Sequence, residues 1–311
     1  MQLSRCKNRA YMLKLTAFCL MVCLCTASAG CTDNNSTSQK NTSYGDAVIS
    51  YLGPEGTYTQ EACEKFFGQQ GDLIPYGTVA DAVAALTDGK SDYAVIPQEN
   101  TIGGAVVDYI DTLIAADGIS VTGEVELPIN QNILVLKGTE LSDIKTVYSH
   151  KQGITQSRSW LEDNLPDAEV IEVSSTAEGA RMVAEAGDRS CAAIASAGCA
   201  DVYNLEILAS AIQNNDKNVT RFYVLTKDAP DTEARDRCAF IVSGRASELT
   251  KLLGMLGKNG IELVTIHDRP LKTELGEYCY IIECSGTDLK TLQTIVDGTS
   301  FEFRFLGNFD M

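Results

Sequence analysis

The segment AVISYLGPEGTYTQEACEKFFGQQGDLIPYGTVADAVAALTDGKSDYAVIPQEN, residues 47–100, alternates between two kinds of pattern. Short runs rich in β-branched and aromatic residues predict strands, and the longer runs between them carry apolar residues at helical spacing. The strands are expected at 48–53, 73–77 and 93–100, and the helices at 59–68 and 79–89. Strands separated by single helices imply a parallel sheet with helices on both faces. This segment therefore predicts an α/β fold.

The same alternation continues to residue 205 and predicts a second α/β lobe. The strands expected at 207–212 and 219–225 would return the chain to the first lobe. Ligands of open α/β sheets bind at the carboxyl ends of strands, so two lobes like those of periplasmic binding proteins would enclose a cleft. The expected extents are about 47–125 with 207–228 for the first lobe, 130–205 for the second, and 47–228 for the whole domain.

After the charged linker TKDAPDTEARDR, residues 226–237, the order of the elements changes. Residues 238–309 read as strand, helix, strand, strand, helix and strand. This βαββαβ order predicts a ferredoxin-like fold with an antiparallel sheet. We therefore expect a separate domain at 237–311, which is large enough to be a small independent unit.

The first thirty residues have the pattern of a signal peptide. Basic residues precede the apolar run LTAFCLMVCLCTASA, and the stretch from Ser28 to Cys31 resembles the bacterial lipobox. Cleavage there would leave Cys31 lipid-modified at the start of a polar tether, residues 31–46, so that the protein is exported and anchored to the membrane. Two alternatives remain open: an ordinary signal peptide, or a misassigned start codon that would make the protein cytoplasmic.

Composition narrows the possible partners. The chain has 25 basic and 42 acidic residues, a net charge of −17, which repels nucleic acid and anionic lipid. We therefore expect no nucleic-acid partner, and membrane contact only through the lipid anchor. Beyond Cys31 no CxxC pair occurs, which leaves zinc and thioredoxin chemistry without support. A disulfide is possible in an exported protein, but the spacing of the cysteines identifies none.

Arg221 is the unusual residue of the strand expected at 219–225. A guanidinium on a buried strand is costly without a partner, and no acidic residue is adjacent to it in the sequence. Three other stretches also place polar side chains at strand ends. Helix capping is the alternative interpretation of the first two, and for His150 in the third the alternative is a hydrogen-bonded polar residue without a catalytic role. The three stretches are GPEGTYT with Thr57 and Thr59, PQENTIGG with Glu99, Asn100 and Thr101, and SHKQGITQ with His150, Gln152 and Gln156.

Together these stretches resemble the prephenate dehydratase family with a C-terminal ACT domain. The family motifs GPxGTFS, PxENSxxGxV and SHxQxxxQxRxWL are matched by GPEGTYT, PQENTIGGAV and SHKQGITQSRSWL. The AIAS and NxTRF motifs are matched by AAIAS and NVTRF, and the ACT-domain end by EFRFLGNF. The resemblance covers about residues 48–309. Thr59 and Thr101 replace the family's serines and keep the hydroxyl.

The resemblance implies a lyase that converts prephenate to phenylpyruvate with no metal or redox cofactor. It puts Thr220 at the catalytic position, where the hydroxyl would donate or relay a hydrogen bond. Arg221 would bind one of the two carboxylates of prephenate. Glu99 is the alternative acid if it is buried. The implied substrate-binding residues are Arg221, Asn100, Thr101, Thr57, Thr59, His150, Gln152, Gln156 and Asn218.

The C-terminal domain departs from the family pattern where phenylalanine would bind. The family's GALxxxL stretch corresponds to ASELTKLL, with Ala246 and Leu249, and its ESRP stretch to residues 267–270. The latter residues are His267, Asp268, Arg269 and Pro270. The lost glycine and the added carboxylate predict a weak response to phenylalanine or none. The resemblance also implies paired ACT domains, in a homodimer or a tetramer.

Two other functions remain open from the sequence. Arogenate dehydratase is the nearest enzyme, and no motif separates it from prephenate dehydratase. A non-catalytic solute-binding lipoprotein would also have two α/β lobes on a tether. Such a receptor would need Arg221 for a carboxylate but would not need the hydroxyl of Thr220.

Overall fold

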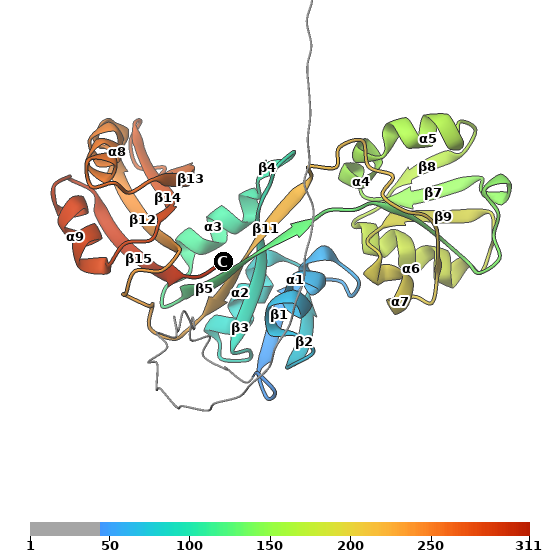
Figure 1. Ribbon diagram of the computed structural model, residues 1–311, viewed down its shortest axis with the longest axis horizontal. Helices are drawn as coiled ribbons and strands as arrows, with labels where there is room; N and C mark the ends of the chain where they lie inside the picture. Colours follow the sequence, from blue (N-terminus) through green and yellow to red (C-terminus); the bar gives the residue numbers. More distant parts are fainter. Residues whose placement is uncertain (1–43) are drawn as a thin grey trace, which may run out of the picture. The chain divides into compact units, whose positions relative to one another are not determined.

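The computed structural model describes residues 44–311, which form three β-sheets with their helices (Figure 1). The expected signal peptide, the lipidation site Cys31 and the tether as far as residue 43 lie outside the described residues. No helix between residues 44 and 311 is long and apolar enough to cross a membrane.

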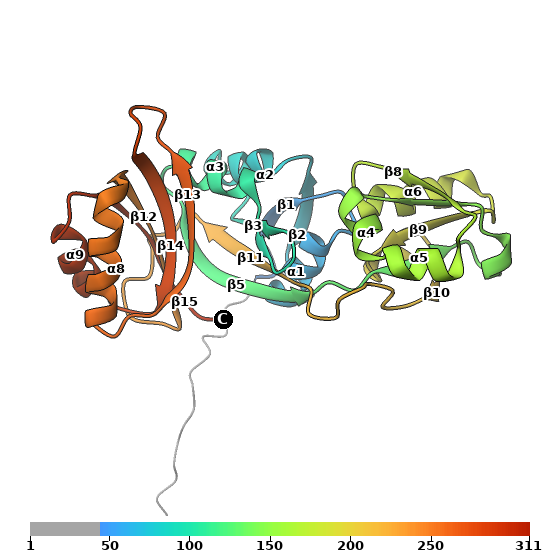
Figure 2. The same ribbon diagram turned by 90° about the horizontal axis from the view of Figure 1, so that it is seen from above.

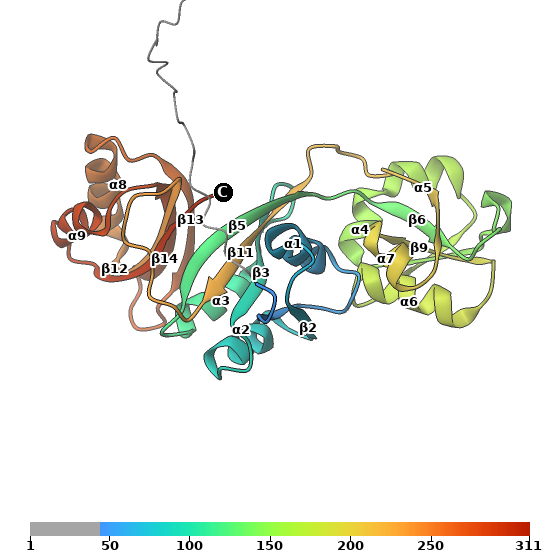
Figure 3. The same ribbon diagram turned by 60° about the horizontal axis from the view of Figure 1, so that its bottom comes forward.

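The first sheet is mixed. Its strands are β1 (Val48–Leu52), β2 (Asp72–Tyr76), β3 (Tyr93–Asn100), β4 (Gly104–Ala105), β5 (Ser120–Pro128) and β11 (Val219–Thr226), and its helices are α1 (Tyr58–Phe67), α2 (Val79–Thr87) and α3 (Val107–Ala115). The strand order is β2-β1-β3-β11-β5, with β4 paired to β3. β1, β2 and β3 are parallel, whereas β11 runs antiparallel between β3 and β5. Figure 3 shows β5 and β11 side by side.

β5 is a strand that the sequence patterns do not predict. Its apolar residues, Val121, Val125 and Leu127, alternate with polar ones except at Gly123, and Glu124 is only 5% exposed although it occupies a polar position of this alternation. The register with β11 also shifts opposite Gly123, as in a β-bulge. The expectation of a parallel first sheet is therefore wrong, because two antiparallel strands, β11 and β5, complete it.

The second sheet has the order β10-β6-β9-β7-β8. Its strands are β6 (Asn132–Val135), β7 (Thr146–Ser149), β8 (Glu169–Glu172), β9 (Cys191–Ala195) and β10 (Glu206–Ala209), and its helices are α4 (Lys151–Gln156), α5 (Arg158–Asn164), α6 (Thr176–Ala186) and α7 (Gly198–Val202). β10 pairs with β6, so it remains in the second lobe instead of returning to the first as expected. Only β11 returns.

The third sheet confirms the expected βαββαβ order. Its elements are β12 (Arg237–Arg245), α8 (Leu249–Lys258), β13 (Leu263–Pro270), β14 (Glu277–Ser285), α9 (Leu289–Asp297) and β15 (Glu302–Phe309). The strand order is β13-β14-β12-β15, with antiparallel neighbours throughout. Figure 2 shows α8 and α9 on the same side of this sheet.

Both faces of the third sheet are buried. Phe240 and Val242 of β12 pack with α8 and α9, whereas Ala239 and Ile241 of the same strand join a core that includes α3, β3 and β11. The described residues, 44–311, accordingly belong to one compact unit. The C-terminal sheet is thus joined to the first lobe by a shared hydrophobic core, in addition to the linker.

Candidate active site

The side chains of β11 alternate between two different cores. Phe222 packs in the core that includes α1, whereas Tyr223 packs in the core shared with the third sheet. Successive strand residues face opposite sides of a sheet, so Thr220 lies on the face of Phe222 and Arg221 on the face of Tyr223. The motif NVTRF therefore directs the candidate catalytic hydroxyl and the candidate substrate-binding guanidinium to opposite faces.

Thr220 belongs to a buried polar group with Asn100 and Asn218, which we call the Thr220 cluster. The Nδ2 of Asn100 donates to Thr220 Oγ1 at 2.9 Å and to Asn218 Oδ1 at 2.7 Å. The Oδ1 of Asn100 accepts from the backbone N–H groups of Ile102 and Gly103, which fixes the amide. Thr220 Oγ1 is therefore an acceptor here, and within residues 44–311 no hydrogen bond uses its proton.

Thr101 links the strands that carry the cluster. Its hydroxyl donates to the carbonyl of Lys217 at 2.9 Å and accepts from the backbone N–H of Val219 at 3.0 Å. Both bonds join the end of β3 to the beginning of β11. The structure thus uses this expected substrate-binding hydroxyl to hold two strand ends together.

The second lobe reaches the Thr220 cluster through SHKQGITQ. The Nε2 of Gln152 lies 3.5 Å from Asn100 Oδ1. His150 caps α4, because its Nδ1 accepts from the backbone N–H of Gln152 at 3.3 Å. Gln152 therefore brings the motifs of the two lobes together, whereas the hydrogen bond of His150 is that of a helix cap.

Two buried amide nitrogens near this junction have no partner among the described residues. They are Nδ2 of Asn218 and Nε2 of Gln156, whose Oε1 accepts from Gln131 at 3.0 Å. Buried donors are almost always hydrogen-bonded in folded proteins. Asn218 and Gln156 are among the substrate-binding residues that the motifs imply, so their unused N–H groups are suited to bind an anionic ligand.

The GPEGTYT turn packs against the second lobe. The carbonyl of Gly56 accepts from Ser196 Oγ at 2.7 Å and from Cys199 Sγ at 3.0 Å. Thr57 does not cap α1 with its side chain as expected, because its hydroxyl donates to the carbonyl of Leu52 instead. Thr59 is buried. The first N–H groups of α1 thus have no cap from Thr57, which leaves the helix start available to an anion.

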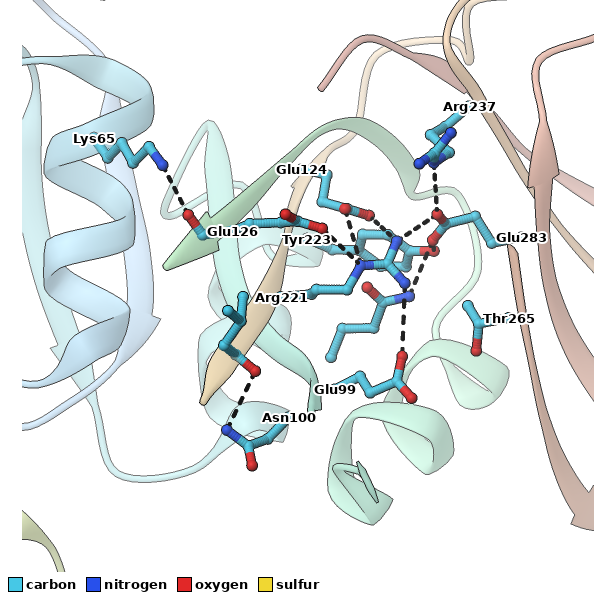
Figure 4. A network of polar contacts seen from close by, with 12 residues as sticks. Lys65, Glu99, Asn100, Glu124, Glu126, Arg221, Tyr223, Arg237, Thr265 and Glu283 are labelled. Atoms are coloured by element: carbon cyan, nitrogen blue, oxygen red, sulfur yellow. Dashed lines mark hydrogen bonds and ion pairs between the residues drawn. The ribbon is translucent and has the colours of Figure 1, made fainter. Parts of the chain in front are cut away.

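Arg221 is surrounded by carboxylates (Figure 4). Its Nε donates to Glu124 Oε1 at 3.0 Å, and its Nη2 donates to Glu124 Oε2 at 2.5 Å and to Glu283 Oε1. Glu99 lies 3.6 Å from Nη1 and Glu126 3.8 Å from Nε. Carboxylates of the protein therefore neutralise this arginine, although no acidic residue is adjacent to it in the sequence. The partners are distant in sequence and come from β3, β5 and β14.

Glu283 is fully buried at the centre of this group. It accepts from Tyr223 Oη at 2.6 Å and from Gln98 Nε2 at 3.1 Å, and it lies 3.4 Å from Arg237 Nε. Burial and the charge of Glu283 raise the pKa of Glu124 to about 7, against the opposing effect of Arg221. These six residues form what we call the Arg221 network: Gln98, Glu124, Arg221, Tyr223, Arg237 and Glu283.

Glu99 lies on the network side of the sheet. The register of β3 against β11 shifts between Arg221 and Phe222, which leaves Gln98 as an extra residue on β3. Such a bulge places two neighbouring residues opposite one. Gln98 thus bonds to Glu283 and Glu99 pairs with Arg221, whereas Asn100 bonds to Thr220. The alternative acid Glu99 is consequently paired with Arg221, away from the Thr220 hydroxyl.

The residues aligned with a phenylalanine site divide between the two faces of the third sheet. Arg269 forms a two-bond ion pair with Asp111 of α3, and the His267 ring packs edge-on against Tyr109. Burial lowers the pKa of His267. Strand alternation turns Asp268 to the opposite face, that of α8. Ala246 and Leu249 lie at the start of α8, and Pro270 ends β13.

Comparison with known proteins identifies the family. The family model of prephenate dehydratase matches residues 49–230, which contain both lobes and the Thr220 cluster. The chain belongs to the prephenate dehydratase family. Membership places it among the dehydratases, which are lyases.

Relatives agree with this assignment. The prephenate dehydratase of Lactococcus lactis subsp. cremoris is 30% identical over 274 residues, 85% of this chain and 97% of that protein. The bifunctional chorismate mutase/prephenate dehydratase of Neisseria gonorrhoeae is 37% identical over 241 residues, 77% of this chain, which span 66% of that protein. The solved prephenate dehydratase from Arthrobacter aurescens in complex with L-Phe is 28% identical and has a TM-score of 0.77. The match covers 85% of this chain and 90% of that chain.

Sequence reasoning missed the partners of Arg221. Glu124 lies on the unpredicted strand β5, and Glu283 lies 62 residues after Arg221 in another sheet. One signal was available for Glu283, because it is a charged residue within the apolar run YCYIIECS. A charge in such a run requires a partner of opposite sign.

Proposed function

We propose that this chain converts prephenate to phenylpyruvate, a step of phenylalanine biosynthesis. The bond between the ring and its carboxylate breaks, and its electron pair enters the ring. The ring hydroxyl takes up one proton and leaves as water, while the carboxylate leaves as carbon dioxide. Aromatisation of the ring drives the reaction. No electrons pass to an acceptor, so this chemistry requires no redox cofactor.

The hydrogen bond from Asn100 to Thr220 is the observation that carries the mechanism. Because Asn100 Nδ2 donates to Thr220 Oγ1, the hydroxyl proton remains free to point at the departing hydroxyl of the substrate. An oriented donor aimed at developing charge stabilises the transition state more than the bound substrate. Thr220 thus acts by directed hydrogen bonding, and Asn100 orients it.

Uncharged donors bind the carboxylates of prephenate in this proposal. Asn218 Nδ2 and Gln156 Nε2 are buried and unused, and Gln152 reaches the Thr220 cluster from the second lobe. The uncapped start of α1 adds backbone N–H groups. Arg221, whose donors are engaged by protein carboxylates, is left out of the first contact with the substrate.

Regulation and location belong to the same proposal. We infer that residues 237–311 act as an ACT domain that pairs subunits in a homodimer or tetramer. Phenylalanine would bind weakly, because Ala246 and Asp268 alter the stretches that hold it in the family. We also infer that Cys31 carries the lipid anchor of an exported protein. A shift of Cys31→Ser from the membrane fraction to the soluble exported fraction would support the anchor.

Replacement of Thr220 tests the function. We expect Thr220→Ala to lower kcat about 100-fold or more, as for the loss of an oriented donor, with KM little changed. Thr220→Ser is the matched control and should keep most of the activity. Phenylpyruvate formation is measured with purified full-length protein.

Three outcomes would contradict parts of this proposal. Unchanged kcat in Thr220→Ala would remove the catalytic role of the hydroxyl. Prephenate binding without turnover in the parent protein would favour a solute-binding function. A higher kcat/KM for arogenate than for prephenate would assign the chain to arogenate instead.

A further inference from the structure

We infer that Glu283 of the third sheet is a positioning residue for the dehydratase reaction, acting through Arg221 on the strands that carry Thr220 and Asn100. The inference rests on the proposed role of Thr220. It gives the C-terminal sheet a direct part in turnover, independent of any effector.

The contacts of Glu283 converge on two strands of the first sheet. It accepts hydrogen bonds from Gln98 on β3 and from Arg221 and Tyr223 on β11. No other carboxylate of the third sheet forms an ion pair with β3 or β11 within residues 44–311. Within the shared hydrophobic core, Glu283 is therefore the point at which the third sheet forms buried polar bonds to both strands.

This point lies directly behind the Thr220 cluster. Arg221 follows Thr220 in the chain, and Gln98 is two residues before Asn100. Thr220 and Asn100 are partners in the register of β11 and β3, and Arg221 is the partner of Glu99. A shift of the Arg221 backbone must therefore move Thr220. Misplacement of a catalytic group by about 1 Å can cost about 100-fold in rate.

The charges explain why Arg221 suits this role better than substrate binding. Its Nε and Nη2 donate to Glu124 and Glu283, and its Nη1 lies near Glu99. A buried guanidinium fixed by two buried carboxylates has little freedom, because moving either partner would leave a buried charge unpaired. Arg221 thus fixes the position of β11 relative to β14.

Simple docking of the third sheet is the competing explanation. Other polar contacts join this sheet to α3 and the residue after it: Arg269 pairs with Asp111, and Arg304 donates to the carbonyl of Ala116 at 2.7 Å. Neither contact touches β3 or β11. Asp111→Asn therefore weakens docking without altering the Arg221 network, and it is the matched control for Glu283→Gln.

The experiment compares full-length Glu283→Gln, Asp111→Asn, Arg221→Met and the double variant Glu283→Gln/Arg221→Met. We expect Glu283→Gln to lower kcat about 10- to 100-fold with KM changed by less than about threefold, and Asp111→Asn to leave both within about twofold. The double variant should lose less activity than the product of the two single losses, because Glu283 and Arg221 act in one network.

Hydrogen exchange gives a second readout that needs no turnover. We expect Glu283→Gln to raise the exchange of backbone amides at 219–222, whereas Asp111→Asn should not. Unchanged exchange at 219–222 in Glu283→Gln overturns the inference, whether or not the parent is active on prephenate. Lack of activity in the parent would by itself contradict only the proposed function. Equal effects of both variants would reduce Glu283 to a docking contact. A rise in the KM of Arg221→Met at constant kcat would support substrate binding by Arg221 instead.

Discussion

At the residue scale, Glu124 and Glu283 share the guanidinium of Arg221. Both carboxylates bond to Nη2 of Arg221, and both are buried. Two carboxylates that share one site repel each other, so that one of them holds its proton more tightly. Burial and the charge of Glu283 raise the pKa of Glu124 to about 7.

This shift predicts how stability depends on pH. The folded pKa of Glu124, about 7, lies above its ordinary value of 4.5. The stability contributed by the protonated form is therefore full below about pH 4.5 and is lost as the pH rises through 7. Glu124→Gln mimics the protonated form. Its free energy of unfolding should fall less over this range than that of the parent, as measured by urea unfolding at each pH.

A second carboxylate on the same strand provides the control. Glu126 is exposed and lies 3.8 Å from Nε of Arg221. We expect Glu126→Gln to retain the pH dependence of the parent. If Glu124→Gln and the parent lose stability in parallel, Glu124 is ionised throughout this range, contrary to the prediction.

At the scale of elements, the turn before α1 joins the first lobe to the second. Gly56 has φ of 83°, and a Cβ at this position would lie 2.8 Å from Cys199 Sγ. Gly56→Ala should therefore both strain the turn, by about 1–2 kcal/mol, and push the second lobe away from α1. We expect lower stability together with a lower kcat/KM, measured by urea unfolding and prephenate turnover.

Gly118 offers a matched control for this prediction. Its φ is 69°, but a Cβ there would have no atom within 4 Å. Gly118→Ala should lose a similar amount of stability to backbone strain and should retain its kcat/KM. If the two variants lose activity equally, the contact between the turn and Cys199 has no role in the site.

The sequence predicts most elements correctly but misses how they meet. β3 is predicted at its observed bounds, and the motifs of β3 and α4 come together through Asn100 and Gln152 as expected. β5 is not predicted, and the apolar and polar alternation of its sequence does not reveal that Glu124, at a polar position, is buried. A buried acid can be recognised as part of a strand only once its partner is known.

The position of Arg221 on the sheet was visible in the sequence, but its protein partners were not. The period of two in a strand already separates Thr220 from Arg221, so one of them had to face away from a site that contained the other. The partner of Arg221 was not visible, because Glu283 lies in a different sheet. Contacts between distant segments depend on packing, and local patterns do not encode them.

At the scale of the whole described unit, the third sheet completes the first lobe. Tyr109, Tyr223 and Ile96 share a core with Ile241 and Ile281 of the C-terminal sheet. Removing that sheet would expose this core and leave Arg221 without Glu283. An exposed apolar surface of this kind promotes aggregation.

We therefore predict that a chain shortened to end at Asp228 loses its cooperative unfolding transition and binds a hydrophobic dye. Circular dichroism and dye fluorescence measure these properties. A chain that lacks only residues 1–43 is the control, because the described fold begins after them, and it should unfold cooperatively. A stable, soluble product that ends at Asp228 would show that the first lobe does not depend on the shared core.

The buried charges between β11 and β14 also limit how this protein can be recombined. Regulatory modules are often exchanged between enzymes as interchangeable parts, with only the linker adjusted. Here a foreign module would have to supply a carboxylate in place of Glu283 and a cation in place of Arg237, on adjacent strands. A chimaera that lacked the carboxylate would bury the positive charge of Arg221 with one fewer counter-ion. Module and enzyme can therefore be inherited or engineered only as a pair.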